Sequence, residues 1–463
     1  MNTRSIYLSK LCLTAGIGII FVFSLFSTHA QQPTNPSSVR VGVFDVDATP
    51  PVGSLLAYDT MAGAWDLGLR AKGIVILGQG DPIVLCAVDW IGIANESHDL
   101  FREKLAKAAG TSSERVTVHA VHQHDAPRSD FGAEKLLLDA GFDPGNFEGT
   151  YQRELLERLS LEVSKAAARS VAVTHVGFGE AEVHQVASNR RVLGEDGMVQ
   201  FVRYSATKDP TAIAAPEGTI DPKVAVLSFW QEDNPIAVLS YYAVHPQSYY
   251  RTGIANPDFP GLARFIRQAE VPSALHIHFT GAAGNVTAGK YNDGSPENRL
   301  ALAQRLADGM QRAYEKTEKS RLYPNSIRWI TESVRLAPNS EIRLKLENPE
   351  NNAVWLAENA SKLAWLNRYK AGHRTLLSCL AINDIRILHM PAELFVEYQL
   401  AAIQMQPTRK VTMAAYADYG LGYIGTAESY SQGGYEVRVS PFDEHAEKVL
   451  MTAIRHMLNE AEN

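Results

Sequence analysis

The chain has 463 residues, of which 45% are hydrophobic and 21% are charged, a balance that is typical of a globular enzyme and too apolar for a disordered protein. Its formal net charge of -7 comes from 44 basic and 51 acidic residues spread along the sequence. Because this pattern offers no basic patch for nucleic acid, we expect a small-molecule or lipid substrate and no nucleic-acid partner.

The first 30 residues have the pattern of a targeting segment. Basic residues precede an apolar run over residues 11–26, and cleavage is expected after Ala30. A membrane span needs about 20 apolar residues, so this shorter run favours a removed signal peptide over an anchor. We therefore predict an exported protein, periplasmic or secreted, with no membrane span after cleavage. A short linker over residues 31–39 and a single catalytic domain over residues 40–463 would follow.

From Val41 onward, short apolar runs alternate with longer helical stretches, which predicts an α/β fold with mixed β-sheets flanked by helices. Pairs of apolar runs around polar turns predict three hairpins, which join residues 73–78 to 83–89, 224–230 to 236–242, and 376–382 to 385–390. Helices are expected near residues 96–109, 149–169, 296–317, 351–369, 394–404 and 443–460. Cys86 and Cys379 lie in apolar runs, where buried free thiols are the simple interpretation and one disulfide between strands is the alternative.

A histidine pair, His122 and His124, follows the strand-like run over residues 115–121. If the backbone stays extended there, residues two apart project to the same side, so both rings can face one pocket. One ring could then bind a metal and the other could contact substrate. The alternative is a pair of solvated or hydrogen-bonded loop histidines, and a second such pair, His276 and His278, shows how readily the pattern arises.

Other polar residues also follow predicted strands. His245 precedes a proline, which restricts it to an extended conformation. Asp258 could orient an imidazole or cap the helix that follows. Glu393 lies at a strand-to-helix junction, where an acid is favoured by the helix dipole in any case. The Tyr- and Gly-rich stretch over residues 416–426 could present phenols to a cavity or simply pack.

The stretch over residues 281–289 consists mostly of small residues, which permit a close approach of the backbone to a ligand. It lacks the Lys-Ser/Thr ending of a phosphate-binding loop. A nucleotide site is therefore not expected here.

Taken in order along the chain, these segments resemble the catalytic domain of the neutral (non-lysosomal) ceramidases. The opening run over residues 41–51 is similar to the first strand of that family and its Asp-x-Thr-x-Pro turn, and Ala-Val-Asp89 is similar to a later strand end. Four further matches are to the family's His-Thr-His-Ser-Gly-Pro, Asn-Arg, Pro-Gly-Glu and Tyr-Ile-Thr-Thr elements, at residues 122–127, 189–190, 391–393 and 423–426. His245 matches the second zinc histidine of the family.

The resemblance implies four Zn²⁺ ligands, a nitrogen and oxygen donor set that this metal accepts: His122, His245, Glu393 and Tyr423. It further implies that His124 contacts the substrate or transition state and that Arg190 is a substrate-binding cation. Water activated at the metal would attack a carbonyl while these two side chains steady the developing oxyanion. The implied activity is zinc-dependent hydrolysis of a carboxamide bond, as in N-acylsphingosine amidohydrolases.

The sequence also departs from the family pattern. Thr287 keeps a hydroxyl as a candidate catalytic group, but the acid and proline that flank it in the family are absent. Arg128 and Asp130 replace a Gly-rich turn and bring charges close to the expected metal, and we expect no C-terminal β-sandwich domain.

These differences concern the substrate, because the sequence shows no apolar slot for two long chains. A zinc-dependent esterase or lactonase acting on a polar, carbohydrate-derived substrate is therefore the alternative to a ceramidase-like amidase. A non-catalytic ligand-binding protein on the same scaffold is a third hypothesis.

Overall fold

Three β-sheets with helices on their outer faces organise the chain in this computed structural model, which describes residues 38–78, 80–348, 350 and 352–461. The described residues lie in one compact unit, Pro36–Asn463. The predicted signal peptide, and most of the linker after it, lie outside the described residues.

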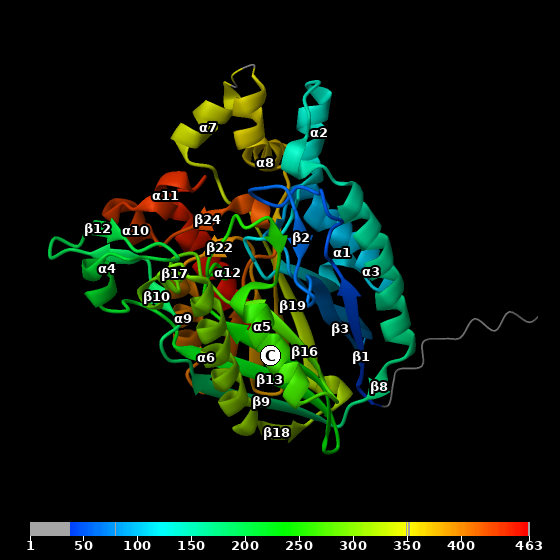
Figure 1. Ribbon diagram of the computed structural model, residues 1–463. Coiled ribbons are helices and arrows are strands. Elements are labelled where there is room, and N and C mark those ends of the chain that lie inside the picture. The colour runs from blue at the N-terminus through cyan, green and yellow to red at the C-terminus, as the bar shows by residue number, and fades with distance from the viewer. Residues whose placement is uncertain (1–37, 79, 349, 351, 462–463) are drawn as a thin grey trace, which may run out of the picture. The chain divides into compact units, whose positions relative to one another are not determined.

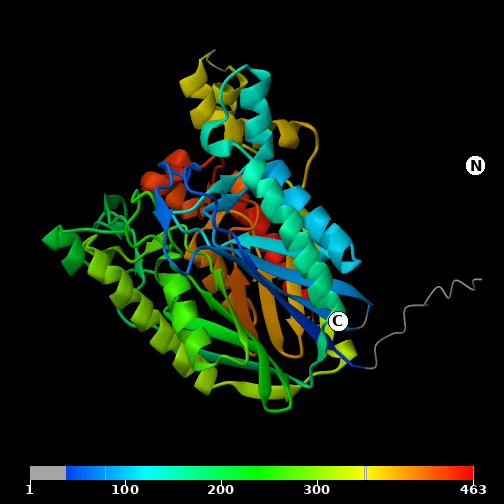
Figure 2. The same ribbon diagram turned by 45° about the vertical axis from the view of Figure 1, so that its right-hand side comes forward.

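The first sheet has the strand order β6-β4-β3-β1-β8. Its strands are β1 (Arg40–Asp47), β3 (Arg70–Gly78), β4 (Gly80–Val88), β6 (Val116–Ala120) and β8 (Val171–Ala172). The β3–β4 hairpin is confirmed, although its turn is tighter than expected because Gly78 already pairs with Gly80. Helices α1 (Asn95–Ala109) and α3 (Thr150–Ala168) lie against this sheet, as Figure 2 shows for the cyan helices and blue strands.

The second sheet has the order β16-β14-β13-β9-β18. Its strands are β9 (His175–Glu182), β13 (Lys223–Gln231), β14 (Asn234–Tyr242), β16 (Leu275–Thr280) and β18 (Glu318–Arg321). The β13–β14 hairpin is confirmed, but its turn is at Glu232 and Asp233, one residue before the predicted position. Helices α5 (Asp258–Glu270) and α6 (Pro296–Glu315) cover this sheet (Figure 1).

The third sheet has the order β19-β20-β21-β23. Its strands are β19 (Ile327–Val334), β20 (Thr375–Ile382), β21 (Ile385–His389) and β23 (Lys410–Ala414). The β20–β21 hairpin turns at Asn383 and Asp384 as predicted. Helices α8 (Ala353–Lys370), α9 (Val396–Met405) and α12 (His445–Glu460) pack against this part of the fold.

The inner faces of the three sheets share one hydrophobic core, and strand β4 shows how. Its residues Ile83, Leu85 and Ala87 point into the shared core, whereas the alternate residues Val84 and Cys86 point toward α1 and α3. Strands buried on both faces need continuous apolar runs, which is the pattern that the sequence shows. Cys86 and Cys379 are buried and free, so the disulfide alternative is wrong.

Several elements were not expected from the sequence. The additional helices are α2 (Phe131–Asp139), α4 (Pro210–Ala214), α7 (Ser340–Glu347), α10 (Ala427–Gln432) and α11 (Tyr435–Val439). Short 3-10 turns occur at Ser113–Arg115, Gly145–Phe147, Gly289–Tyr291, Pro324–Ser326 and Tyr419–Leu421. Within the described part of the chain, no helix is long and apolar enough to cross a membrane.

Five short two-stranded ladders join loops at the strand ends. They pair β2 (Gly63–Ala64) with β15 (Ile254–Ala255), β5 (Gly92–Ile93) with β7 (Arg128–Ser129), β10 (Ser188–Asn189) with β17 (Val286–Thr287), β11 (Arg191–Leu193) with β12 (Val199–Val202), and β22 (Glu393–Leu394) with β24 (Tyr423–Ile424). Strands this short carry no periodicity that a sequence could reveal.

Candidate metal centre

The carboxyl ends of three strands, one from each sheet, lead into the candidate site. His122 follows β6, His245 follows β14, and Glu393 follows β21. The β22–β24 ladder then sets Glu393 directly beside Tyr423. Strand ends are where ligand sites of α/β folds are usually found.

His122 is held in one orientation by its surroundings. Its φ is +79°, so the backbone is not extended there and the expectation of an extended His-Gln-His segment is wrong. The backbone N–H donates to Trp90 O at 2.9 Å, and the ring Nδ1 lies 2.5 Å from Ile91 O. Because Nδ1–H donates to this carbonyl, Nε2 keeps its lone pair for a metal.

The three histidine rings nevertheless converge. The Nε2 atoms of His122 and His245 are 3.1 Å apart, and ring atoms of His122, His124 and His245 lie within 4.8 Å of one another. All three rings are buried. Burial, followed by the neighbouring His122 and Arg190, lowers the pKa of His124 and His245 well below its usual value, which favours neutral rings.

Glu393 completes the buried donor set. Its Oε2 lies 3.5 Å from His122 Nε2 and 3.9 Å from His245 Nδ1, yet it accepts no hydrogen bond from any described residue. A buried carboxylate oxygen without a donor is costly unless a cation lies against it. Two nitrogens bound tetrahedrally to zinc lie about 3.3 Å apart, which is close to the separation of the two Nε2 atoms. The residues therefore fit a divalent metal with nitrogen and oxygen ligands.

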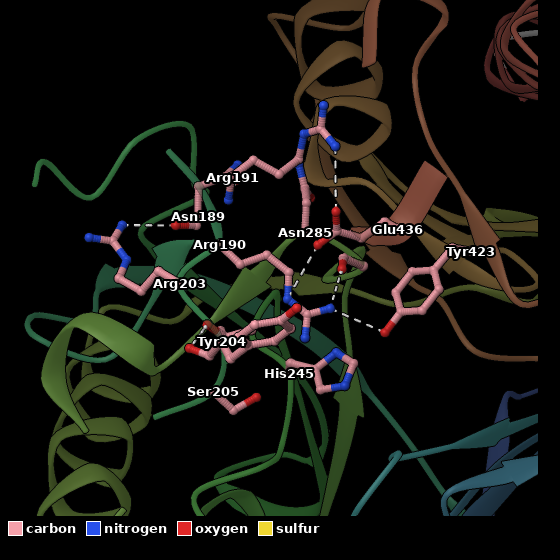
Figure 3. A network of polar contacts seen from close by, with 12 residues as sticks. Asn189, Arg190, Arg191, Arg203, Tyr204, Ser205, His245, Asn285, Tyr423 and Glu436 are labelled. Atoms are coloured by element: carbon pink, nitrogen blue, oxygen red, sulfur yellow. Dashed lines mark hydrogen bonds and ion pairs between the residues drawn. The ribbon is translucent and has the colours of Figure 1, made fainter. Parts of the chain in front are cut away.

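Arg190 and Tyr423 meet at the edge of this group (Figure 3). Arg190 Nη1 donates to the Tyr423 hydroxyl at 3.1 Å and to Gly284 O at 3.2 Å, and its Nε lies 3.5 Å from Glu436 Oε1. Burial lowers the pKa of Arg190, but the neighbouring Tyr423 hydroxyl and the Glu436 carboxylate outweigh it, so the pKa is raised. Burial, and after it the negative charge of Glu393, raises the pKa of the Tyr423 hydroxyl. A permanent cation is thereby fixed beside the candidate site.

Two further tyrosines enclose His122. The rings of Tyr416 and His122 are stacked with centroids 4.6 Å apart, and the Tyr419 centroid is 5.2 Å from that of His122. The Tyr- and Gly-rich stretch over residues 416–426 contains both tyrosines, but only Tyr423 was predicted from the sequence as a site residue. Tyr419 fits because its ring covers Gly92, where a Cβ would overlap it.

Backbone strain is concentrated at this site. Tyr416 has φ of +64° and Ala392, which stands where the ceramidase pattern has glycine, has φ of +68°. The Tyr416 N–H donates to Ala392 O at 3.1 Å, and the Ala120 N–H donates to Tyr416 O at 3.1 Å. Left-handed conformations of such residues persist only where the surrounding structure holds them, and they gather at functional sites.

Within the loop of small residues over 281–289, Gly284 lies directly against the backbone of the segment that carries Glu393. Gly284 N–H donates to Leu394 O at 2.7 Å, and a Cβ at Gly284 would overlap the Glu393 carbonyl oxygen. The loop therefore permits close approach of the Glu393 backbone. Thr287 donates to Tyr204 O at 3.3 Å and accepts from Gly289 N–H at 3.2 Å, and neither bond leads to the histidines. Its catalytic role stays a prediction.

A buried ion pair between Asp89 and Arg264 anchors the segment that carries His122 and His124. Asp89 accepts two hydrogen bonds from Arg264, at 2.8 and 2.6 Å, and one from Gln123 Nε2 at 3.1 Å. Gln123 lies between His122 and His124, so this carboxylate anchors the segment that carries both rings. Arg264 and Glu436 had no sequence signal, since both act through contacts with residues far along the chain.

The remaining candidates lie apart from the histidine cluster. Asp258 accepts from the backbone N–H of Ser248 and of Phe259, so it ties the loop after His245 to the start of α5, and no imidazole bonds to it in the described chain. His276 and His278 are buried in β16, where burial lowers the pKa of each to about 3.

Asp130 and Arg128, the two charged residues expected near the metal, each form hydrogen bonds within the fold. Asp130 caps α2, and burial raises its pKa to about 7. Arg128 donates to Ala57 O at 3.3 Å, while its buried Nε has no hydrogen-bond partner among the residues that the structure describes.

No protein-family model and no curated protein sequence matches this chain. Solved structures of ceramidases are similar to it. The crystal structure of neutral ceramidase from Pseudomonas aeruginosa has a TM-score of 0.66 at 17% identity, covering 92% of this chain and 75% of that chain. A ceramidase complexed with C2 gives the same TM-score and identity, covering 92% and 76%. This chain thus has the neutral ceramidase fold, and the predicted fold class is confirmed.

Proposed function

We propose that this protein is an exported, zinc-dependent hydrolase of carboxamide bonds, similar in its reaction to the ceramidases whose fold it shares. The observation that carries the proposal is the buried Oε2 of Glu393, which lacks a hydrogen-bond donor and lies 3.5 Å from His122 Nε2. A divalent cation among these atoms would neutralise that carboxylate.

The residues that would hold the metal are His122, His245, Glu393 and Tyr423. When bound, zinc supplies Lewis acidity, which polarises a carbonyl and lowers the pKa of water toward neutrality. His122 is prepared as a ligand because Ile91 O fixes the proton on Nδ1. Tyr423 shares its hydroxyl with Arg190, and the guanidinium favours an oxygen that carries negative charge.

Arg190 and His124 would act on the substrate. The Arg190 guanidinium is held by its hydrogen bonds to Gly284 O and the Tyr423 hydroxyl, with Glu436 3.5 Å from its Nε, so it is oriented before substrate arrives and loses little entropy on binding an oxyanion. His124 Nδ1 is buried and has no hydrogen-bond partner within the described residues. As a neutral ring, His124 could donate to or accept from the reacting group from either nitrogen.

The alternative is hydrolysis of an ester or lactone in a polar substrate. It is favoured by the polar groups beside the site, among them the Arg190 guanidinium and the Tyr423 hydroxyl. The same metal and the same oxyanion contacts would serve either bond, so this alternative changes the leaving group and leaves the roles of the residues as they are.

The test is metal content together with turnover. Purified protein should contain about one zinc per chain by mass spectrometry of metals, and a chelator should abolish amide hydrolysis that added zinc restores. The variant His124→Ala should keep its zinc and lose rate, whereas His245→Ala should lose both. Full turnover by metal-free protein would refute the proposal. Detection of the mature protein outside the cytoplasm, with its amino terminus after residue 30, tests export.

A further inference from the structure

A cavity of about 320 Å³ lies next to the candidate metal centre and is lined by residues 204–206 and 247–250. It adjoins the centre through the chain, because Gln247 N–H donates to the carbonyl oxygen of His245 at 2.9 Å. It also adjoins the centre in space, because the ring centroids of Tyr250 and His124 are 5.8 Å apart. Figure 3 shows Tyr204 and Ser205 on the side of Arg190 and His245.

Tyrosine rings form the walls at this end of the centre. Tyr58 is stacked on His124, with centroids 5.9 Å apart and planes 10° apart, and its centroid is 5.0 Å from that of Tyr250. Arg251 lies over both tyrosine rings, at 5.5 and 5.4 Å, and so fixes them from outside. Tyr58, Tyr204 and Tyr250 are 42%, 51% and 39% exposed, which is unusual for rings this close to a buried site. Part of each ring is therefore accessible to a ligand, although Arg251 covers part of the Tyr58 and Tyr250 rings.

The edges of the cavity are polar. Gln247 Oε1 accepts from Ser205 at 2.6 Å, while Gln247 Nε2 and the hydroxyls of Tyr204 and Tyr250 make no hydrogen bond within the described part of the chain. Ala206 is the one lining side chain made only of hydrocarbon. An alkyl chain placed here would strip water from these groups and return no hydrogen bond, which is the costly case for a polar group.

We infer that this cavity binds the carbohydrate ring of an acylated sugar and presents its acyl group to His124 and Arg190. A pyranose matches both features, since its C–H faces pack on aromatic faces and its hydroxyls reach the amide and phenols at the edges. The volume is at the lower end of the range for small-molecule sites, about 300 to 1,000 Å³, which suits one or two rings and not two long chains. The inference rests on the proposed hydrolase and names its substrate class.

The reaction on such a substrate is a simple hydrolysis. The bond from the acyl carbon to the sugar nitrogen or oxygen breaks, and a new bond forms between that carbon and the oxygen of water. One proton of the water goes to the departing amine or hydroxyl, and the products are a carboxylic acid and the free sugar. No oxidant or further reactant is needed.

The experiment compares acetyl amides that differ in the group attached to the amide nitrogen, using the zinc-loaded full chain. N-acetylglucosamine carries the ring, N-acetylethanolamine lacks it, and N-acetylsphingosine offers a hydrocarbon chain. We expect kcat/KM for the first to exceed that for the second by tenfold or more. In Tyr250→Leu this ratio should fall by about 2- to 12-fold, the range of one aromatic contact, through a higher KM for the sugar. The control Tyr323→Leu, an exposed tyrosine outside the cavity, should keep the ratio.

A second variant separates binding from folding. Gln247→Leu should lower the preference for the ring and raise relative turnover of N-acetylsphingosine, because it removes the unpaired amide. Equal turnover of ring and ringless amides, or a preference for N-acetylsphingosine in the unmodified protein, would overturn the inference while zinc-dependent hydrolysis still stood. If no acetyl compound is hydrolysed, the proposed function fails. Calorimetric titration with N-acetylglucosamine then decides the cavity: binding weakened in Tyr250→Leu supports it, and absence of binding overturns it.

Discussion

Replacing Asp89 by asparagine should cost this protein more stability than any single surface ion pair provides. Asp89 is fully buried and Arg264 is 5% exposed, and their bidentate contact is at 2.8 and 2.6 Å. Asp89→Asn leaves the guanidinium buried without its counter-charge, and breaking a buried pair in this way costs about 3 to 5 kcal/mol. The same substitution also loosens Gln123, which bonds to this carboxylate and lies between two of the site histidines.

The matched control is the pair Lys104–Glu157. Its distance is also 2.6 Å, but the side chains are 40% and 67% exposed, so Glu157→Gln should cost about 0 to 1 kcal/mol. The double variant Asp89→Asn/Arg264→Met should recover part of the loss, since no uncompensated charge remains. The free energy of unfolding would be measured by denaturant titration at constant m-value.

Zinc affinity provides an independent readout of Asp89→Asn. Residues that orient metal ligands from behind usually change affinity by about 10- to 100-fold, and we expect a loss in that range by chelator competition. The reasoning is refuted if Asp89→Asn costs no more than Glu157→Gln, or if the folded variant binds zinc as tightly as the unmodified protein.

Three further predictions follow from the same structure. His122→Ala should lose its zinc and its hydrolytic activity while far-ultraviolet circular dichroism stays close to that of the unmodified protein, and a metal-replete, active variant would contradict the ligand assignment. Gly284→Ala should cost about 1 to 3 kcal/mol by denaturant titration, because the new methyl group overlaps the Glu393 carbonyl oxygen and must displace the strand that carries this ligand. Burial lowers the pKa of His98 to about 4, so the unfolded chain alone takes up this proton below pH 6.5, and this one group should contribute about 1.4 kcal/mol per pH unit to the loss of stability as pH drops toward 4. His98→Gln should remove that slope in pH-dependent unfolding, whereas a change of similar size in the exposed control His184→Gln would count against the explanation.

Much of the scaffold could be predicted because its strands are buried on both faces. Runs such as those of β4 and β13 carry apolar residues at successive positions, and their turns hold Gly, Asp or Asn. The positions of His122, His245 and Glu393 just after strands were visible for the same reason. What brought these residues under one hypothesis was the resemblance to the ceramidases, since no local pattern links segments that are far apart.

Other parts of the site had no local signal. The β22–β24 ladder is two residues long, and Glu436 meets Arg190 only through the tertiary fold. The backbone at His122 is left-handed, so the segment is not extended, contrary to the expectation from the sequence. The rings of His122 and His124 nevertheless lie close together. The small residues over 281–289 were visible in the sequence, but the close approach of Gly284 to the backbone of Glu393 was not.

The three expected metal ligands at strand ends come from three different sheets, which has a consequence for how this protein would fold. His122 and His245 are 123 residues apart and belong to different sheets, and Glu393 comes from a third. No partly assembled chain possesses the complete set, so the binding energy of a metal accrues only to the finished molecule. Contacts of such high contact order form late and slowly. Bound zinc would therefore stabilise the contacts between the sheets, which form last. Its removal should weaken these contacts between sheets before it weakens the hydrogen bonds within any one sheet.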